Sequence, residues 1–376
     1  MASGQAIDRN AAGDWCERLS APYRRPFAGA VAAFGTADDT VFQSYGWIDA
    51  RHPSPPGAGT LFEIGSITKV FTALLLAKFA SQGRIDLDAP IASIAPEFAG
   101  APEWITPRRL STHSSGLPRI PWSLWSRRAW SFSFPESKFN TYPCFGETEL
   151  IEWMARYRPS RRPRTNRSSY SNLGVGLLGF ILGRIAGSTY EAALKQEILD
   201  PLDLKDTRIA LDENQLSRFA TPHRGNGKEA PPWNFEALAG AGALRSTAHD
   251  LVKFGRAIIA ATEGAGPLHE PIVKTLEIQI AGRRRYEPSV CLGWHTLPAM
   301  DAPKAIYGHD GGTFGSMSLL FVCPEAGFVI LSLANTCFTL RIILRQIKCN
   351  PAGLLKEIVE TLGQQAASEA DVPKRA

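Results

Sequence analysis

Hydrophobic and polar positions divide this chain into a strand-rich start, a helical middle and a strand-rich end. Residues 27–34 and 40–48 are rich in valine, phenylalanine, tyrosine and tryptophan, and the turn at Gly35 between them predicts a β-hairpin. After a loop rich in proline and glycine, residues 66–82 are apolar almost all the way round. That pattern is typical of a helix buried inside a protein, and Gly83 is expected to end it.

The middle and end of the chain complete the predicted fold. Helical patterns cover residues 147–156, 172–186, 190–199 and 247–261, and Thr247 with Asp250 resembles a capping box. Strand patterns cover residues 289–296, 305–308, 316–322 and 327–334, and a last helix is split by Pro351. We therefore expect an α/β (α+β) fold in which both chain ends build one antiparallel sheet, flanked by helices, with a mostly helical subdomain inserted between them.

Size and charge limit the function classes. With 376 residues, 44% of them hydrophobic, the chain is long enough for two packed units or one domain with a large insertion. A net charge of +5 is too small to indicate nucleic acid as a partner. The charge is nevertheless concentrated in a stretch without acids, which leaves open a solvated loop or a docking patch for an anionic substrate or partner. This stretch contains Arg156, Arg158, Arg161, Arg162, Arg164 and Arg167.

Membrane, redox and metal signals are weak. The longest apolar stretches, at residues 70–80 and 173–183, are about half the roughly 18–20 residues of a membrane span, so no span is expected. The N-terminus lacks the apolar core of a signal peptide, so we expect a cytoplasmic protein. The six cysteines form no CxxC pair and are interpreted as ordinary thiols. No two histidines have the spacing of metal ligands, and no metal or cofactor is expected.

Several common catalytic signatures are absent from the sequence. It contains no Gly-x-Ser-x-Gly, no His-Glu-x-x-His and no Gly-x-x-x-x-Gly-Lys-Ser/Thr, which excludes the nucleophile elbow of α/β-hydrolases and the usual zinc-protease and P-loop motifs. The GxGxxG match that begins at Gly174 lies within a helical pattern and is interpreted as tight helix packing.

A candidate nucleophile and its base stand at the start of the predicted buried helix. Ser66 and Lys69 stand three residues apart at its start, so their side chains share one face. A serine hydroxyl needs a base to take its proton, and a lysine is such a base when burial lowers its pKa. The first turn of the helix also offers free backbone N–H groups to a developing oxyanion.

Two further motifs supply candidate site residues. Tyr170 and Asn172 stand where a loop enters the next helix, so that a phenol and an amide can face one site. The sequence His309-Asp310-Gly311-Gly312 lies between two strand patterns, and its glycines allow a ligand to approach the backbone. His223 also fits His-x-Gly, but no strand pattern flanks it. Four other histidines are interpreted as surface or core residues: His113, His249, His269 and His295.

In this order, Ser66-x-x-Lys69, Tyr170-x-Asn172 and His309-x-Gly311 resemble the serine β-lactamase and penicillin-binding-protein superfamily, in its class C-like branch. That branch includes β-lactamases, esterases, D-amino-acid amidases and peptidases, and acyltransferases. Further sequence segments resemble this superfamily too, including residues 62–72, 110–118, 241–251 and 308–315.

The resemblance assigns roles. Ser66 would be the acylated nucleophile, Lys69 its base and Tyr170 a second proton relay. Asn172 would bind a substrate amide or carbonyl, and His309 would replace the lysine of the family's Lys-Thr-Gly motif. The backbone N–H groups of Ser66 and Gly312 would form the oxyanion hole. The two subdomains, about residues 1–85 with 286–376 and about 86–285, would then be halves of a single catalytic domain over residues 1–376, with the site between them.

Departures from the family pattern favour some activities over others. Asp310 stands where the family offers a hydroxyl to a substrate carboxylate, and its negative charge disfavours a β-lactamase if it faces the site. Residues 122–145 contain eight aromatic side chains. They either line the site for an apolar acyl group or form an insertion with its own small core. These are Trp122, Trp125, Trp130, Phe132, Phe134, Phe139, Tyr142 and Phe145.

We therefore expect a serine acyl-hydrolase that cleaves a small ester or amide, or a peptide, with a hydrophobic acyl part. One alternative is a cytoplasmic acyltransferase or peptide cyclase that accepts an acyl group from an acidic carrier protein, held by the arginines of residues 156–167. Another is an inactive relative that only binds peptides or cell-wall fragments.

Overall fold

A six-stranded antiparallel sheet is the centre of the computed structural model, which describes residues 8–49, 53–121, 142–284, 287–297, 304–337 and 339–370. The strand order is β2-β1-β8-β7-β6-β5. The N-terminal strands are β1 (Ala30–Gly35) and β2 (Thr40–Tyr45), and the C-terminal strands are β5 (His295–Thr296), β6 (Tyr307–Gly312), β7 (Met317–Cys323) and β8 (Phe328–Ala334). Both chain ends therefore build one sheet, and the predicted α/β fold is confirmed.

Strand β1 joins the two ends of the chain. It pairs with β2 in the predicted hairpin and with β8 on its other side, where Ala30 lies opposite Ala334. All six residues of β1 and all seven of β8 are buried, because helices cover both faces of these central strands. Alternate residues contact different cores: Val31 packs with the core on one face, and Phe34 with the core on the other.

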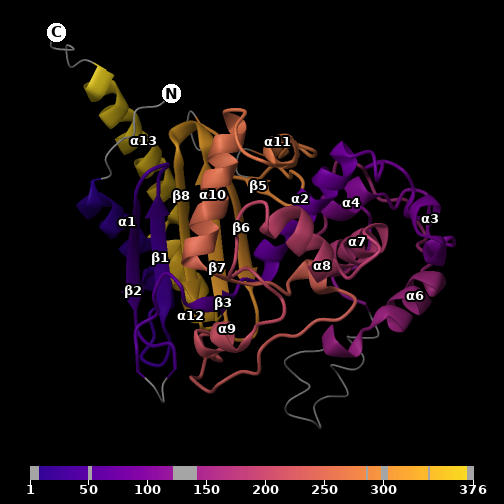
Figure 1. Cartoon of the computed structure of the whole chain (residues 1–376), viewed down its shortest axis with the longest axis horizontal. Coiled ribbons are helices and arrows are strands. Elements are labelled where there is room, and N and C mark those ends of the chain that lie inside the picture. Colours follow the sequence, from indigo (N-terminus) through magenta and orange to yellow (C-terminus); the bar gives the residue numbers. More distant parts are fainter. Residues whose placement is uncertain are drawn as a thin grey trace.

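Helices form a layer on each face of the sheet and a larger cluster beside it (Figure 1). Helices α1 (Arg9–Ser20), α12 (Leu340–Cys349) and α13 (Pro351–Ala370) lie on one side, and α10 (Ala248–Thr262) with α11 (His269–Leu276) on the other. The remaining α-helices are α2 (Thr68–Ser81), α3 (Ile91–Ile94), α4 (Pro107–Ser111), α6 (Glu147–Arg156), α7 (Asn172–Ile185), α8 (Tyr190–Leu194) and α9 (Glu213–Ser217). The predicted subdomain boundaries stay a prediction.

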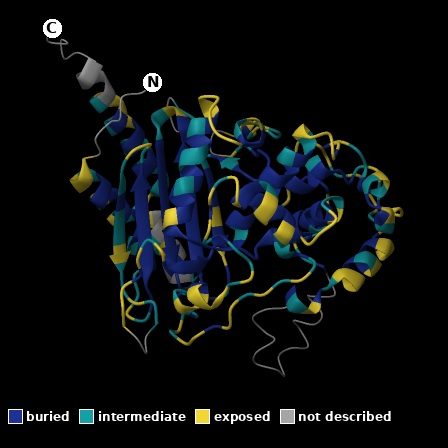
Figure 2. Cartoon of the chain, in the orientation of Figure 1, coloured by how far each residue is buried: buried dark blue, intermediate teal, exposed yellow. Residues whose placement is uncertain are grey.

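Helix α2 is buried on nearly every side, as its apolar sequence predicts (Figure 2). It begins after the 3-10 turn Gly65–Ile67, and the left-handed Gly83 follows its end. Helix α7 packs closely on the turn Ala239–Ala241, because a Cβ on Gly179 would lie 2.8 Å from the Cα of Gly240. The GxGxxG match in α7 therefore serves helix packing, as predicted.

The structure differs from the predicted elements in several places. The strand expected over residues 289–296 shrinks to β5, because Gly293, with φ of +73°, turns the chain beside the backbone of α2. Strand β6 continues through the candidate residues up to Gly312 instead of ending at residue 308. Helices α1, α3, α4, α9 and α11 were not predicted from the sequence. Thr247 caps α10, but the Asp250 carboxylate accepts from Asp206 and Thr207 instead of closing a capping box.

All six cysteines are free, and three of them, Cys16, Cys291 and Cys323, are buried. Within the described ranges no single helix is long and apolar enough to cross a membrane; only α7 together with residues 190–199 passes that test, as a pair bent by 77°.

Candidate active site

The nucleophile candidate lies where α2 meets the end of strand β6. Ser66 is half-buried in the 3-10 turn before α2. The preceding Gly65 has a φ of +48°, and a Cβ there would lie 2.7 Å from the backbone nitrogen of Gly312. Only glycine permits this approach. The turn therefore places the backbone of Gly65, next to Ser66, beside the backbone of Gly312, and the oxyanion hole stays a prediction.

Two proton-carrying groups converge on the Ser66 hydroxyl. Lys69 Nζ lies 3.0 Å from Ser66 Oγ, and the Tyr170 hydroxyl donates to the same oxygen over 2.6 Å. Lys69 also donates to the carbonyl oxygen of Ala241 over 2.6 Å. Because Tyr170 donates into Ser66 Oγ, the proton of Ser66 itself can point to a lone pair on a neutral Lys69.

Burial sets the protonation of both groups. The Lys69 side chain is 1% exposed, and loss of solvation lowers its pKa to about 7; the charge of Asp310 works against this and that of Arg119 adds to it. The pKa of Tyr170 rises well above its ordinary value, chiefly through burial of its hydroxyl. Near neutral pH the lysine is therefore partly a free base, while the tyrosine keeps its proton.

His113 holds the Tyr170 segment in place. Its Nδ1 accepts the backbone N–H of Ser171 over 3.2 Å, its carbonyl oxygen accepts from Ser169 N over 2.7 Å, and its ring centroid lies 4.5 Å from that of Tyr170. His113 is buried and has a φ of +58°, an uncommon conformation for a residue other than glycine. The sequence interpretation as a surface or core residue is right about burial but misses this contact with the site.

Asn172 presents one free acceptor. Its Nδ2 donates to the Tyr142 hydroxyl over 2.8 Å, and its backbone N–H donates to the Arg119 carbonyl over 2.9 Å. Its Oδ1 is buried and has no hydrogen-bond partner among the described residues. A buried carbonyl without a partner is costly, so this oxygen is suited to accept an N–H or O–H from a substrate.

Strand β6 turns its candidate residues to two faces. His309 and Gly311 are buried, while Asp310 and Gly312 are exposed. A Cβ on Gly311 would lie 2.0 Å from the Ile64 carbonyl oxygen, whereas a Cβ on Gly312 would meet nothing within 4 Å. Gly311 is thus required for the close contact with the nucleophile segment, and Gly312 lies on the open side.

His309 lies in the position predicted from the family motif but is not a cation. Its Nδ1 lies 2.6 Å from the Asp310 carbonyl oxygen, to which it donates as a neutral ring, and its Nε2 is buried without a partner among the described residues. Burial lowers the pKa of His309 well below its ordinary value, and the ring of His295 packs edge-on at 5.5 Å. The missing cation matters because the family's lysine offers a charge at this point.

Asp310 is exposed and close enough to act on the site. Burial lowers the pKa values of Lys69, His295 and His309, and the negative charge of Asp310 opposes that fall; burial raises the pKa of Tyr170, and the same charge adds to that rise. Any substrate carboxylate placed at this end of β6 would therefore meet a negative side chain and no positive histidine.

Aromatic rings stand beside the nucleophile turn. Tyr142 stacks on Phe235 with ring centroids 4.4 Å apart, and Trp233 packs edge-on against Phe235 and Phe314 at 5.6 and 5.2 Å. Phe235 lies near the nucleophile turn, since a Cβ on Gly242 would lie 3.1 Å from its ring and 3.7 Å from the backbone of Gly65. We call Tyr142, Trp233, Phe235 and Phe314 the aromatic wall.

Most of the predicted aromatic segment lies outside the described residues. That applies to Trp122, Trp125, Trp130, Phe132, Phe134 and Phe139, while Tyr142 and Phe145 are described and buried. The sequence interpretation missed Trp233, Phe235 and Phe314, because their contribution depends on loops that meet only in the folded chain.

The Glu63 side chain forms hydrogen bonds with two other segments of the site. Its carboxylate is buried and accepts from the backbone N–H of Trp233 and from the Thr313 hydroxyl, each over 2.5 Å. Burial raises the pKa of Glu63, and the charge of Arg245 opposes that rise. One side chain thus links the nucleophile segment, the aromatic wall and the residue after Gly312.

Other candidates lie elsewhere. The His223 ring packs near that of Phe27, and its backbone bridges Thr336 after β8. His249 is an exposed residue of α10. In the arginine stretch, Arg156 pairs with Glu152, while Arg161, Arg162 and Arg164 are exposed. No group of three or more metal-ligating side chains occurs within the described part of the chain.

The sheet and its covering helices have the fold of class C β-lactamases. The solved class C β-lactamase from Rhodobacter sphaeroides matches this fold with a TM-score of 0.73 and 23% identity, covering 93% of this chain and 99% of that one. A β-lactamase from Sulfitobacter sp. EE-36 matches with a TM-score of 0.74 and 22% identity, covering 95% and 100%. These likenesses concern the fold.

Sequence comparison identifies the family. The model described as Beta-lactamase matches residues 15–340, and the chain belongs to this family, as predicted. A β-lactamase from Pseudomonas fluorescens is 28% identical over 67% of this chain and 65% of its own length. Penicillin-binding protein 4 from Amycolatopsis lactamdurans is 27% identical over 73% and 72%, and the D-alanyl-D-alanine-carboxypeptidase/endopeptidase AmpH from Escherichia coli is 24% identical over 78% and 76%.

Proposed function

We propose that this protein is a serine acyl-hydrolase that forms an acyl-enzyme on Ser66 and cleaves an ester or amide with a hydrophobic acyl part. The observation that carries the proposal is the convergence of Lys69 Nζ and the Tyr170 hydroxyl on Ser66 Oγ. A nucleophile, a base that is partly neutral at pH 7 and a protonated acid meet at one oxygen, which is what acyl transfer needs.

Acylation begins with proton transfer from Ser66 to neutral Lys69. Ser66 Oγ attacks the substrate carbonyl, and the resulting oxyanion faces the backbone N–H groups of Ser66 and Gly312. Tyr170 then gives its proton to the leaving oxygen or nitrogen, the bond to the leaving group breaks, and the acyl-serine remains. The ammonium of Lys69 returns the proton to Tyr170, so no net proton is gained or lost by the enzyme.

Deacylation reverses the roles with water as the attacking group. Water loses a proton to the Lys69–Tyr170 pair and adds to the acyl carbonyl. The tetrahedral intermediate then expels Ser66 Oγ, which recovers its proton. The products are a carboxylic acid and the regenerated enzyme.

The substrate class follows from the surroundings of Ser66. The aromatic wall offers an apolar surface next to the nucleophile turn, which favours an aliphatic or aromatic acyl group. Neutral His309 and exposed Asp310 disfavour a carboxylate at the end of β6. Although relatives are named β-lactamase and D-alanyl-D-alanine-carboxypeptidase, we therefore favour an esterase or amidase for this chain.

A second candidate is acyl transfer from an acidic carrier protein, favoured by the exposed Arg161, Arg162 and Arg164. Carrier-dependent acylation would weaken steeply as salt is raised, whereas hydrolysis of a small neutral ester would not. Equal salt dependence of the two reactions would exclude carrier docking through these arginines.

Intact-protein mass spectrometry after reaction with a p-nitrophenyl alkylphosphonate tests the proposal. The wild type should gain one covalent adduct, and Ser66→Ala should gain none. Ser217→Ala is the matched control, since Ser217 is an exposed serine on α9 that should not affect labelling. No adduct on the wild type, with no hydrolysis of neutral p-nitrophenyl esters of several acyl lengths, would favour the inactive binding protein instead.

A further inference from the structure

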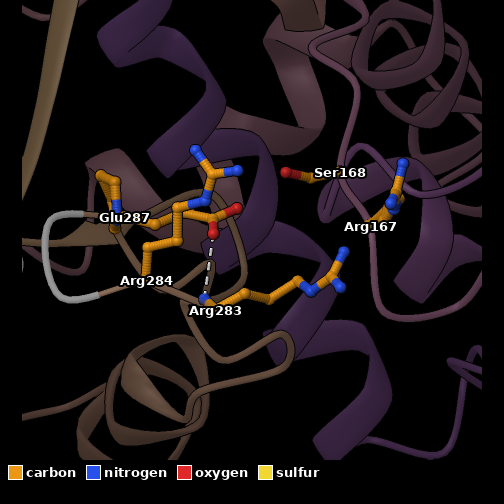
Figure 3. A pocket seen from close by; sticks show the side chains of 6 residues that line it. Arg167, Ser168, Arg283, Arg284 and Glu287 are labelled. Atoms are coloured by element: carbon orange, nitrogen blue, oxygen red, sulfur yellow. Dashed lines mark hydrogen bonds between the residues drawn. The ribbon is translucent and has the colours of Figure 1, made fainter.

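A cavity of about 820 Å³ lies between two arginine-bearing segments (Figure 3). Its volume is within the range of ligand pockets, which is roughly 300–1,000 Å³. Three guanidinium groups and one carboxylate contribute side chains to it, a formal excess of two positive charges. The lining residues are Arg167, Ser168, Arg283, Arg284, Glu287 and Pro288.

One wall of the cavity leads directly to the catalytic tyrosine. Arg167 and Ser168 stand three and two residues before Tyr170. The intervening Ser169 is fixed by its backbone N–H bond to the His113 carbonyl over 2.7 Å. Arg119 also lies near, with its guanidinium carbon 5.2 Å from the centre of the Tyr170 ring. This side of the site is therefore rich in positive charge.

The opposite wall leads to strand β5 and His309. The loop that bears Arg283 and Arg284 rises from a stem in which Ile280 bridges Val290, and Val290 in turn bridges His295. The ring of His295 contacts that of His309 at 5.5 Å. Both walls are thus extensions of segments that reach the candidate active site, one through Tyr170 and the other through His295.

The guanidinium groups are available to a ligand. The Glu287 carboxylate accepts the backbone N–H of Arg283 over 3.0 Å. No carboxylate among the described residues lies within ion-pair distance of Arg167, Arg283 or Arg284, and all three are exposed. In Figure 3 the Arg283 side chain extends from the loop toward the wall formed by Arg167 and Ser168.

We propose that this cavity is an anion subsite of the enzyme, which binds a carboxylate or phosphate carried by the substrate away from the scissile bond. Arginine pairs with such groups through two parallel N–H bonds, and the Ser168 hydroxyl adds a further donor. Asp310 repels an anion at the end of β6, so the charges of the site select substrates whose anion points over Tyr170. The inference rests on the acyl-hydrolase function proposed above.

Matched p-nitrophenyl esters test the subsite on the acyl side: p-nitrophenyl pentanoate is neutral, and mono-p-nitrophenyl glutarate ends in a carboxylate. For the leaving-group side, phenyl butyrate is compared with 4-(butyryloxy)phenyl phosphate. In at least one pair, kcat/KM should be about tenfold higher for the anionic ester than for the neutral one. The factor is modest because exposed ion pairs contribute little, and the measurement is made at low salt because salt screens them. The phosphate and carboxylate arms identify which anion is preferred.

Charge variants locate the effect. Arg167→Gln with Arg283→Gln and Arg284→Gln should bring the anionic-to-neutral ratio close to one. The control combines Arg161→Gln, Arg162→Gln and Arg164→Gln, which removes the same charge from a neighbouring exposed stretch and should keep the wild-type ratio. No anionic preference in the wild type, or an equal loss of preference in both triple variants, would overturn the proposal.

Failure of the proposed function is recognised separately. If the wild type hydrolyses neither neutral ester, calorimetric titration with glutarate and with inorganic phosphate tests the cavity directly. Binding by the wild type that the Arg167, Arg283 and Arg284 triple variant loses would support the anion site without hydrolysis. Absence of binding, or equal binding to both proteins, would overturn it.

Discussion

The positively charged side chains of the candidate active site and of the arginine-lined cavity differ in their burial. Lys69 is enclosed by α2 and the turn at Ala241, and its pKa falls to about 7, so it becomes a base. Arg167, Arg283 and Arg284 are exposed at the surface. Their guanidinium groups stay open to solvent, as the proposed anion subsite requires. Burial thus makes Lys69 the candidate base, and exposure makes the three arginines candidate recognition groups.

Removing the nucleophile gives the largest expected effect. Ser66→Ala should lower kcat for a neutral p-nitrophenyl ester by roughly 10⁴- to 10⁶-fold, because no other group forms the acyl-enzyme. The melting temperature should stay near that of the wild type, since one half-buried hydroxyl is lost. A variant that keeps more than a hundredth of the activity would refute Ser66 as the nucleophile.

Replacing the buried base tests the catalytic half of the comparison. Lys69→Ala should lower kcat by roughly 10³- to 10⁴-fold, and the loss should not add to that of Ser66→Ala, because both act in one step. Lys78→Ala is the control, since Lys78 lies near the end of the same helix, where it is part-exposed. Steady-state kinetics of both single variants and the double variant provide the measurement.

Removal of the phenol should cost less. Tyr170→Phe keeps the ring packed on His113 but removes the hydroxyl that donates to Ser66, so kcat should fall by roughly 10²- to 10³-fold. The fall should be smaller for a p-nitrophenyl ester than for a plain alkyl ester, because a good leaving group needs little protonation. Equal losses with both esters would argue against Tyr170 as the leaving-group acid.

The pH profile should follow Lys69. Below its pKa of about 7 the amine is protonated and unable to accept the Ser66 proton, so kcat/KM for a neutral ester should fall about tenfold per pH unit on the acid side. Above that pH the rate should level off. A profile that is flat from pH 5 to 8 would contradict the assignment of Lys69 as base.

Single charges near the site should shift that profile slightly and in opposite directions. Asp310→Asn removes a negative charge that raises the pKa of Lys69, so the acid limb should move to lower pH. Arg119→Gln removes a positive charge that lowers the same pKa, so the limb should move to higher pH. Shifts of the same sign in both variants would show that these changes act through structure and not through charge.

The hairpin and the proximity of Ser66 to Lys69 could be predicted from the sequence, because both depend on residues close together in the chain. Ser66 and Lys69 share a helix face through their spacing alone, and the hairpin of β1 and β2 follows from alternating strand residues and a turn. Strand β5 was overestimated because Gly293 turns the chain against α2, a contact that no local pattern reveals. His113 and the aromatic wall were missed for the same reason.

By itself the sequence indicated the family and the antiparallel sheet built from both ends, and it singled out the candidate nucleophile and base. Only the tertiary structure decided that Tyr170 reaches Ser66 across 104 positions and that His309 is buried and neutral. It also decided that Arg167 lines a cavity with Arg283 and Arg284. The reason is that the pKa of a side chain and the charge it presents depend on burial and on distant neighbours, which form only when the chain folds.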